Sequence, residues 1–229
     1  SRHVLFSQVV AFLWQRRRMY VSHFLGMSIV GILSYGFYAW IPTMFIRTWG
    51  WTIQEIGLAY GVLTLISGPL AVIAAAKTSE AFSRRGYQDA HMRTALWGSL
   101  IGIVFAVATP LMPHPYLSLI MLLPVSVGTS AATAAGLAAL MMVTPNQMRA
   151  QTSAVYFFVV NILGLTIGPT GIALFTDYVF RDDAMLRYSV ASVSVMAGLF
   201  AAGFLVYNLR HYAASYEEAK NWAEDSADG

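Results

Sequence analysis

Long stretches without a charged side chain divide the sequence into segments that suit a membrane rather than water. A membrane helix needs about 20 consecutive apolar residues, and Asp, Glu, Lys and Arg are absent from residues 19–46, 56–76, 94–148, 150–176 and 188–209. Residues 94–148 are too many for one crossing, and Pro113 and Pro115 interrupt them because proline lacks an N–H donor. Six spans are therefore predicted, at about residues 20–46, 56–76, 94–112, 116–144, 150–176 and 188–209.

The remaining segments flank this predicted all-α membrane domain, residues 19–209. In residues 1–18 apolar side chains recur at helical spacing, which predicts an amphipathic linker helix on the cytoplasmic membrane face; these side chains are Val4, Leu5, Val9, Phe12 and Leu13. Residues 210–229 predict a solvated, partly helical cytoplasmic tail, whose acids are Glu217, Glu218, Glu224, Asp225 and Asp228.

Composition excludes several classes of function. Of 229 residues, 57% are hydrophobic and 11% are charged, about half the charged share of a soluble domain. The net charge of +3 comes from basic residues in membrane-flanking loops, which argues against a nucleic-acid surface. The sequence has no cysteine and its histidines are scattered, so no metal site is expected. Without a nucleophile elbow or a phosphate-binding loop, we expect neither an enzyme nor a cofactor.

The basic residues also predict an orientation. All of them except Arg47, Arg181 and Arg187 fall on the side of the membrane that holds both chain ends. Cytoplasmic loops carry an excess of Lys and Arg, so both termini are expected in the cytoplasm. The expected location is the plasma (inner) membrane.

Polar side chains inside the spans mark a candidate cavity. Such groups are costly in hydrocarbon and usually face a bundle interior or water, which selects Tyr35, Tyr38, Ser130 and Asn161. Each has an alternative explanation that stays open. The tyrosines suit an interfacial aromatic belt, Ser130 suits close helix packing, and Asn161 suits a structural hydrogen bond between helices.

Small residues and prolines predict where helices approach closely. Glycine or alanine recurs every four residues in the fourth span, a spacing that allows close packing. Gly-Pro pairs occupy matching places in the second and fifth spans, which cross in opposite directions, as an inverted repeat would require; chance placement is the alternative. The predicted packing residues are Gly68, Pro69, Gly128, Gly136, Gly164, Gly168 and Pro169.

Two further residues of the first span carry expectations. Pro42 cannot donate to the helix ladder, so the helix is expected to kink or unwind near residues 36–38. His23 lies near the cytoplasmic boundary and is expected to be solvated or interfacial rather than a proton relay.

The loop after the second span carries a known pattern. Ala76 and Glu80 precede Arg84, Arg85 and Gly86. This segment resembles the loop motif of the major facilitator superfamily, Gly-x-x-x-Asp followed by a basic cluster, with Ala76 replacing the glycine and Glu80 the aspartate. An acid at a helix end beside basic residues can hold one conformation and release another. Glu80, Arg84 and Arg85 are therefore the expected conformational latch; a solvated basic loop is the alternative.

Three other segments are similar to the same superfamily. They are residues 35–42, which end in Tyr-x-Trp-x-Pro; residues 144–153, with a Pro-x-x-x-Arg-Ala-x-x-Ser turn; and the Gly-Pro segment 164–171, followed by Asp177. The resemblance covers nearly all of the chain as helices seven to twelve of a twelve-helix transporter, nearest to the spinster-like and organic-anion symporter branches. It implies a half bundle with a 3+3 inverted repeat, and alternating access by two halves that rock about a central site.

The leading hypothesis is the carboxy-terminal half of a secondary transporter for a small organic or amphiphilic solute. The expected partners are the lipid bilayer, the solute and a missing amino-terminal six-helix half or second copy, with no nucleic acid. Because no charged residue lies inside a span, charge-driven coupling would need residues outside this chain. The alternatives are a six-helix homodimeric pore, the membrane domain of an ATP-driven pump, and a scaffold or receptor that transports nothing.

Overall fold

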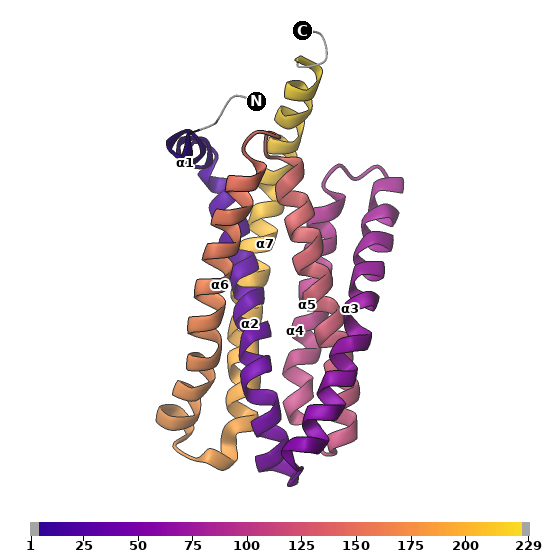
Figure 1. The fold of residues 1–229 in the computed structure, drawn as a ribbon, viewed down its shortest axis with the longest axis vertical. Coiled ribbons are helices and arrows are strands. Elements are labelled where there is room, and N and C mark those ends of the chain that lie inside the picture. Colours follow the sequence, from indigo (N-terminus) through magenta and orange to yellow (C-terminus); the bar gives the residue numbers. More distant parts are fainter. Residues whose placement is uncertain (1–4, 226–229) are drawn as a thin grey trace.

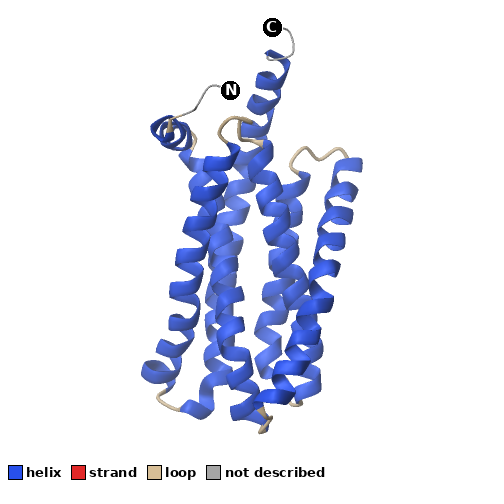
Figure 2. Ribbon diagram, in the orientation of Figure 1, coloured by secondary structure: helices blue, strands red, loops and turns tan. Residues whose placement is uncertain are grey.

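The structure, a computed structural model, describes residues 5–225, and within them it shows helices and loops without a strand (Figure 1, Figure 2). Residues 1–4 of the predicted linker and residues 226–229 of the predicted tail lie outside the described residues. The helices are α1 (Phe6–Gln15), α2 (Arg17–Trp49), α3 (Ile53–Arg84), α4 (Ala90–Ala108), α5 (Pro115–Met142), α6 (Arg149–Leu174) and α7 (Leu186–Asp225).

Six of these helices, α2 to α7, are long and apolar enough to cross a membrane. The predicted all-α fold with six transmembrane helices is therefore confirmed. The helices extend beyond the uncharged runs in several places. A π-helical turn, Phe175–Phe180, continues α6, and α7 runs without a break into the described part of the acidic tail, as far as Asp225.

The turn between α2 and α3 shows why the first span ends and the second begins where they do. Gly50 ends α2 in the left-handed conformation, with φ of 70°, which glycine adopts without the steric cost of a Cβ. Thr52 and Glu55 then form a capping box. The Glu55 backbone N–H donates to Thr52 Oγ1 at 3.2 Å, and the Thr52 backbone N–H donates to Glu55 Oε2 at 2.8 Å. Both helices are thus closed by local chemistry.

Proline does not interrupt α2. The helix continues through Pro42 from Arg17 to Trp49, so of the predicted kink or unwinding near residues 36–38, the unwinding does not occur. Neighbouring helices can stabilise a proline-containing membrane helix, and α6 does so here. A Cβ added at Gly36 would lie 3.3 Å from the Gly168 carbonyl oxygen, and Trp40 Nε1 donates to the Pro169 carbonyl oxygen at 2.9 Å.

By their contacts, the six long helices form two groups of three, and each group combines helices from both halves of the sequence. Helix α2 packs mainly against α6 and α7, and α5 packs mainly against α4 and α3, while α4 and α7 join the two groups. Helices α2, α3 and α4 can be matched in order with α5, α6 and α7. The contact of α2 with α6 then corresponds to that of α5 with α3, and the contact of α2 with α7 corresponds to that of α5 with α4. This is the pattern that a 3+3 inverted repeat requires.

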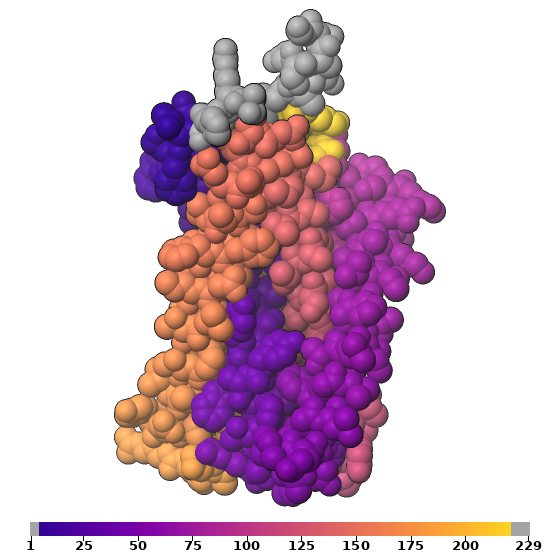
Figure 3. Space-filling view, viewed as in Figure 1, coloured from indigo at the N-terminus to yellow at the C-terminus, as the bar shows by residue number. Residues whose placement is uncertain are grey.

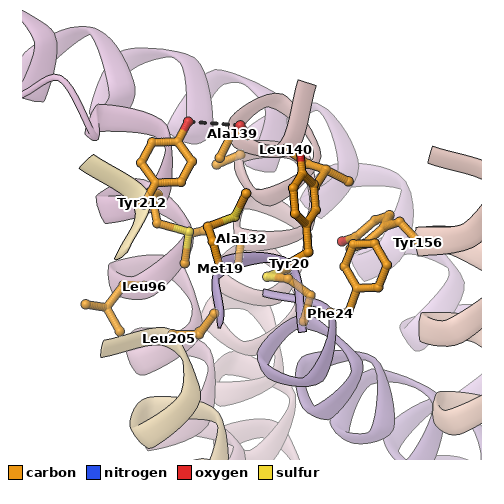
Figure 4. Close-up of a cluster of buried hydrophobic side chains, with 14 of the residues drawn as sticks. Met19, Tyr20, Phe24, Leu96, Ala132, Ala139, Leu140, Tyr156, Leu205 and Tyr212 are labelled. Carbon is orange, nitrogen blue, oxygen red and sulfur yellow. Dashed lines mark hydrogen bonds between the residues drawn. The ribbon is translucent and has the colours of Figure 1, made fainter. Parts of the chain in front are cut away.

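A hydrophobic core closes the end of the bundle at which both described chain ends lie (Figure 1). Tyr20, Phe24 and Tyr156 pack edge to face within it (Figure 4). Tyr212 Oη donates to the Ala139 carbonyl oxygen at 2.9 Å, and Tyr20 Oη donates to the Val143 carbonyl oxygen at 3.0 Å. These hydroxyls bond to the last turns of α5, so the core also fixes α2 and α7 against that helix.

Candidate solute-binding site

A groove of about 470 Å³ lies between α2, α5 and α6, and all four predicted cavity residues line it: Tyr35, Tyr38, Ser130 and Asn161. Figure 3 shows the molecule hollowed between α6, in orange, and the pink to purple surfaces of α5 and α3, with α2 in indigo at the floor. The tertiary structure thus brings together polar residues that are far apart in the sequence. The volume of the groove falls within the range of about 300–1,000 Å³ that is typical of small-molecule sites.

A hydrogen bond joins two of these residues across the α2–α6 contact. Tyr35 Oη donates to Asn161 Oδ1, and Asn161 Nδ2 donates to the Phe157 carbonyl oxygen at 2.7 Å. Both side chains are half-buried. The predicted structural hydrogen bond and the predicted lining of a groove are therefore the same arrangement. A solute that bound here would contact a polar pair already held in place.

Tyr38 extends the groove toward α3. Its side chain is 56% exposed, and its ring centroid lies 5.7 Å from that of Tyr60. A smaller cavity of about 160 Å³ begins at this pair and shares Tyr38 and Ser130 with the main groove. Two helices of each half of the sequence, α2 and α3 from the first and α5 and α6 from the second, therefore contribute to one continuous depression.

The contribution of α3 was missed in the sequence. Tyr60, Thr64 and Ser67 line the smaller cavity together with Gly68. Their spacing of four and three residues places their polar groups on one face of a helix. That periodicity is present in the sequence, where three polar residues are a weak signal beside the apolar length and the Gly-Pro pair of the same span.

The groove offers hydrogen-bonding groups without formal charge. Thr129 and Thr133 donate their hydroxyl hydrogens to carbonyl oxygens one turn earlier in α5, each at 2.9 Å, and Ser34 does the same in α2 at 3.0 Å. Their oxygens remain available as acceptors. Ser130 is exposed to the groove and forms no hydrogen bond with another described residue. Such walls suit a neutral or amphiphilic molecule better than an ion.

Glycines on α6 allow the groove to have this shape. A Cβ added at Gly164 would lie 2.6 Å from Tyr35 Cδ2, and one added at Gly168 would lie 2.9 Å from the Gly36 backbone nitrogen. Real Cβ atoms do not approach other atoms so closely. Pro169 follows within the same helix. These residues bring α6 against α2 and make room for the Tyr35 ring.

The other predicted packing residues differ among themselves. Gly128 lies against α4, where an added Cβ would be 2.7 Å from the Gly98 carbonyl oxygen, and Gly136 lies against the Met27 side chain. Gly68, in contrast, has nothing within 4 Å of an added Cβ, and Pro69 is exposed. The structure therefore places Gly168 in a helix contact and its counterpart Gly68 at the cavity wall, so the two Gly-Pro pairs serve different purposes.

The predicted latch residues lie at the end of α3, on the side of the bundle that holds the described chain ends (Figure 1). Arg84 and Glu80 form an ion pair at 2.6 Å within one helix, and both side chains are exposed. Arg85 caps the helix and is also exposed. The pair bridges no two helices of this chain, so a latch between conformations would need a partner from elsewhere.

The environment of His23 differs from the one predicted from the sequence. The side chain is fully buried between α2 and its neighbours, and its ring centroid lies 5.8 Å from that of Tyr156. The predicted solvated or interfacial environment is therefore wrong. The reason is the packing of α6 against α2, which covers a position that lies near the predicted cytoplasmic boundary in the sequence. His23 forms no part of the groove.

Proteins similar to this chain are known in sequence and in fold. A scan against protein-family profiles finds no match. A curated protein from Mycolicibacterium smegmatis (strain ATCC 700084 / mc(2)155), described as an MFS-type efflux pump, is 24% identical over 208 residues, which cover 85% of this chain and 46% of the pump. This chain thus spans about half the length of the relative it matches.

Two crystal structures of a bacterial homolog of the human lysosomal transporter Spinster have a similar fold. The inward-facing, unoccupied form has a TM-score of 0.67 and 17% identity, over 94% of this chain and 50% of that one. The inward-facing, occupied form has a TM-score of 0.61 and 17% identity, over 87% and 49%. The similar proteins are transporters rather than enzymes. The resemblance to major facilitator transporters is thus found again in sequence and in fold, and the chain has the fold of one six-helix half of such a protein.

Proposed function

We propose that this chain forms the carboxy-terminal half of a secondary active transporter that moves a small organic or amphiphilic solute by alternating access. The observation that carries the proposal is the convergence of Tyr35, Tyr38, Ser130 and Asn161 on one groove. The solute would bind between aromatic rings and uncharged hydroxyl and amide groups. The description of the mycobacterial relative as an efflux pump supports transport as the activity.

A second half would complete the site. The most apolar stretches of α3 and α6 are only 22% buried, compared with 50% for α2, and both helices border the groove. Leu58 and Leu65 of α3 are 73% and 76% exposed. A wall that is open on one side cannot enclose a solute. The similar proteins are about twice as long as this chain, which leaves enough residues for a second six-helix half. The matching halves would then rock about the groove.

The homodimeric pore and the ATP-driven pump are not favoured, because the proteins similar to this chain are major facilitator transporters about twice as long. We further propose that the protein resides in the plasma (inner) membrane with both termini in the cytoplasm. The distribution of Lys and Arg between the two membrane faces supports this orientation. Reporter fusions at each loop test it directly.

Transport in proteoliposomes tests the proposed function. The natural full-length protein that contains these residues is reconstituted, and movement of Nile red, a neutral amphiphilic dye, is followed by fluorescence. Asn161→Ala should slow transport by about tenfold, since a lost hydrogen bond to solute costs up to roughly 1.5 kcal/mol. Thr166→Ala is the matched control, because Thr166 is exposed on the same helix and lines neither cavity. Unchanged transport by Asn161→Ala would refute the assigned site.

A further inference from the structure

A second groove, of about 700 Å³, lies where α1 and the beginning of α2 meet α7. It shares no lining residue with the solute groove. It lies near the end of the bundle that holds both described chain ends (Figure 1). Leu199 and Phe200 of its lining are largely exposed, so the groove opens on the outer surface of the described bundle, between two candidate membrane spans.

The deep part of this groove is apolar. Leu199 is 72% exposed and Phe200 is 59% exposed, so both present most of their side chains to whatever lies in the groove. Gly203 follows one turn later, and a Cβ added there would meet nothing within 4 Å. The absence of a side chain leaves open space along α7. A hydrocarbon chain can pack against this surface by van der Waals contact, the interaction that remains between apolar groups inside a membrane.

The shallow part of the groove is cationic. Arg16 forms an ion pair with Glu218, whereas its neighbours Arg17 and Arg18 are exposed and make no ion pair with a described carboxylate. Arg17 instead donates to the Trp14 carbonyl oxygen at 3.4 Å. Two guanidinium groups thus lie above an apolar channel, and guanidinium matches phosphate oxygens in pairs of hydrogen bonds.

Aromatic side chains mark the depth at which these charges lie. Trp14 of α1 and Tyr207 of α7 both line the groove, and they are 67% and 44% exposed. Tryptophan and tyrosine concentrate at the level of lipid headgroups. The groove therefore runs from headgroup depth, where Arg17 and Arg18 lie, into the hydrocarbon, where Leu199 and Phe200 lie.

We propose that this groove is a binding site for an anionic phospholipid of the adjacent leaflet. The phosphate would contact Arg17 and Arg18, and one acyl chain would follow Leu199, Phe200 and Gly203. Basic pockets between transmembrane helices bind anionic headgroups by the same chemistry. A zwitterionic lipid fits less well, because its ammonium group opposes the two cations. The site is independent of the proposed transport activity.

Lipid retention measured by native mass spectrometry tests the headgroup preference. The natural full-length protein is delipidated in detergent and titrated with dioleoyl phosphatidylglycerol or dioleoyl phosphatidylcholine. Phosphatidylglycerol should bind more tightly, and each of Arg17→Gln and Arg18→Gln should weaken it about fivefold, because a basic residue near an anionic surface contributes on the order of that factor. Arg210→Gln, an exposed charge of α7 outside the groove, should change it less than twofold.

Three results of this titration would overturn the proposal: equal affinity for the two lipids, retention of phosphatidylglycerol by the double arginine variant within twofold of the natural protein, or competition by inorganic phosphate as strong as by the lipid. Gly203→Leu is a second variant that acts on the channel alone. It should weaken both lipids, whereas Gly61→Leu, on the exposed face of α3, should weaken neither.

Crosslinking locates the acyl chain. Phosphatidylglycerol with a diazirine in one acyl chain is irradiated in the presence of the protein, and the labelled peptides are mapped. Labels should concentrate on residues 199–207, and Gly203→Leu should remove them. Labels spread evenly over the exposed faces of α3, α6 and α7 would contradict the proposal. A crosslink between two protein chains through this segment would identify a second copy as the occupant and would equally overturn it.

Discussion

Tyr35 and Asn161 lie on different helices, and the hydrogen bond between them crosses the contact that shapes the groove. Each residue suits two purposes, because a polar group inside a membrane bundle needs a partner whether or not a solute is present. The adjoining Gly164 shows that the arrangement depends on space as well as on polarity, since any larger side chain would displace the Tyr35 ring. The size of the effect on stability and on transport can separate a structural role from a role in solute binding.

A double-mutant cycle on Tyr35→Phe and Asn161→Ala makes that separation. Hydrogen bonds between membrane helices are worth on average about 0.6 kcal/mol and at most about 1.7 kcal/mol. We expect the coupling energy in thermal or denaturant unfolding to fall in this range. Transport should fall by more than that energy explains, because the solute also loses a contact. A transport loss that matched the loss of stability would assign the pair to structure alone.

At the level of helices, small residues decide how closely each pair can approach. Gly128 faces the backbone of α4, where an added Cβ would lie 2.7 Å from the Gly98 carbonyl oxygen and 2.8 Å from the Gly102 nitrogen. Gly136 faces the flexible end of Met27, at 2.9 Å. The two positions share the same helix and a similar distance, but backbone cannot move aside as a methionine side chain can.

Alanine substitution should therefore distinguish these two glycines. Gly128→Ala is expected to lower the free energy of unfolding by about 1–3 kcal/mol, the usual cost of overpacking, because α4 and α5 must separate. Gly136→Ala should cost clearly less. Gly61→Ala serves as a control, since nothing lies within 4 Å of a Cβ there. Thermal unfolding in detergent measures all three, and equal losses at Gly128 and Gly136 would contradict the explanation.

The end of α3 carries the proposed latch of Glu80, Arg84 and Arg85. An exposed ion pair of this kind stabilises a helix by only about 0.3–0.5 kcal/mol, so Glu80→Gln should leave stability nearly unchanged. If the charges hold one conformation through a partner in the other half, the same variant should shift the balance between inward-open and outward-open forms.

Cysteine accessibility measures that balance, and this chain has no cysteine of its own. Glu217→Gln is the control, because Glu217 is an exposed acid at the same end of the bundle and pairs with Lys220 in the tail. An accessibility pattern unaltered by Glu80→Gln would remove Glu80 from the latch.

At the scale of the whole molecule, the bundle has two kinds of exposed apolar surface. One borders the solute groove along α3 and α6, and the other belongs to α7, with Leu199 and Phe200. The first would meet water or the second half of the transporter, and the other would meet lipid. The two faces lie on different helices of the bundle, and the proposed function therefore gives each a different neighbour.

Labelling with a water-soluble maleimide should reveal the difference. Thr64→Cys and Ser130→Cys are expected to react in the natural full-length protein, because both positions line the polar depression. Leu199→Cys should react at least about tenfold more slowly, since a thiol in hydrocarbon forms little of the reactive thiolate. Equal labelling at the three positions would show that the depression is not an aqueous path.

The sequence by itself determined the number of helices long and apolar enough to cross a membrane, and it named four of the residues that line the groove. Both follow from one cost, that of placing charge or unpaired polar groups in hydrocarbon, which acts on each residue separately and therefore leaves a local pattern. The same cost selected Tyr35 and Asn161. The turn at Gly50 and Thr52 is equally local.

Only the tertiary structure decided which polar residues meet. Tyr60 and Thr64 line the smaller cavity because α3 packs beside α5. His23 is buried because α6 packs on α2, and Gly68 and Gly168 have different surroundings. The continuity of α2 through Pro42 likewise depends on its neighbour. Packing acts between residues that are distant in the chain, and it depends on the shapes of both surfaces at once. A hydropathy pattern, which describes one residue at a time, carries no record of that match.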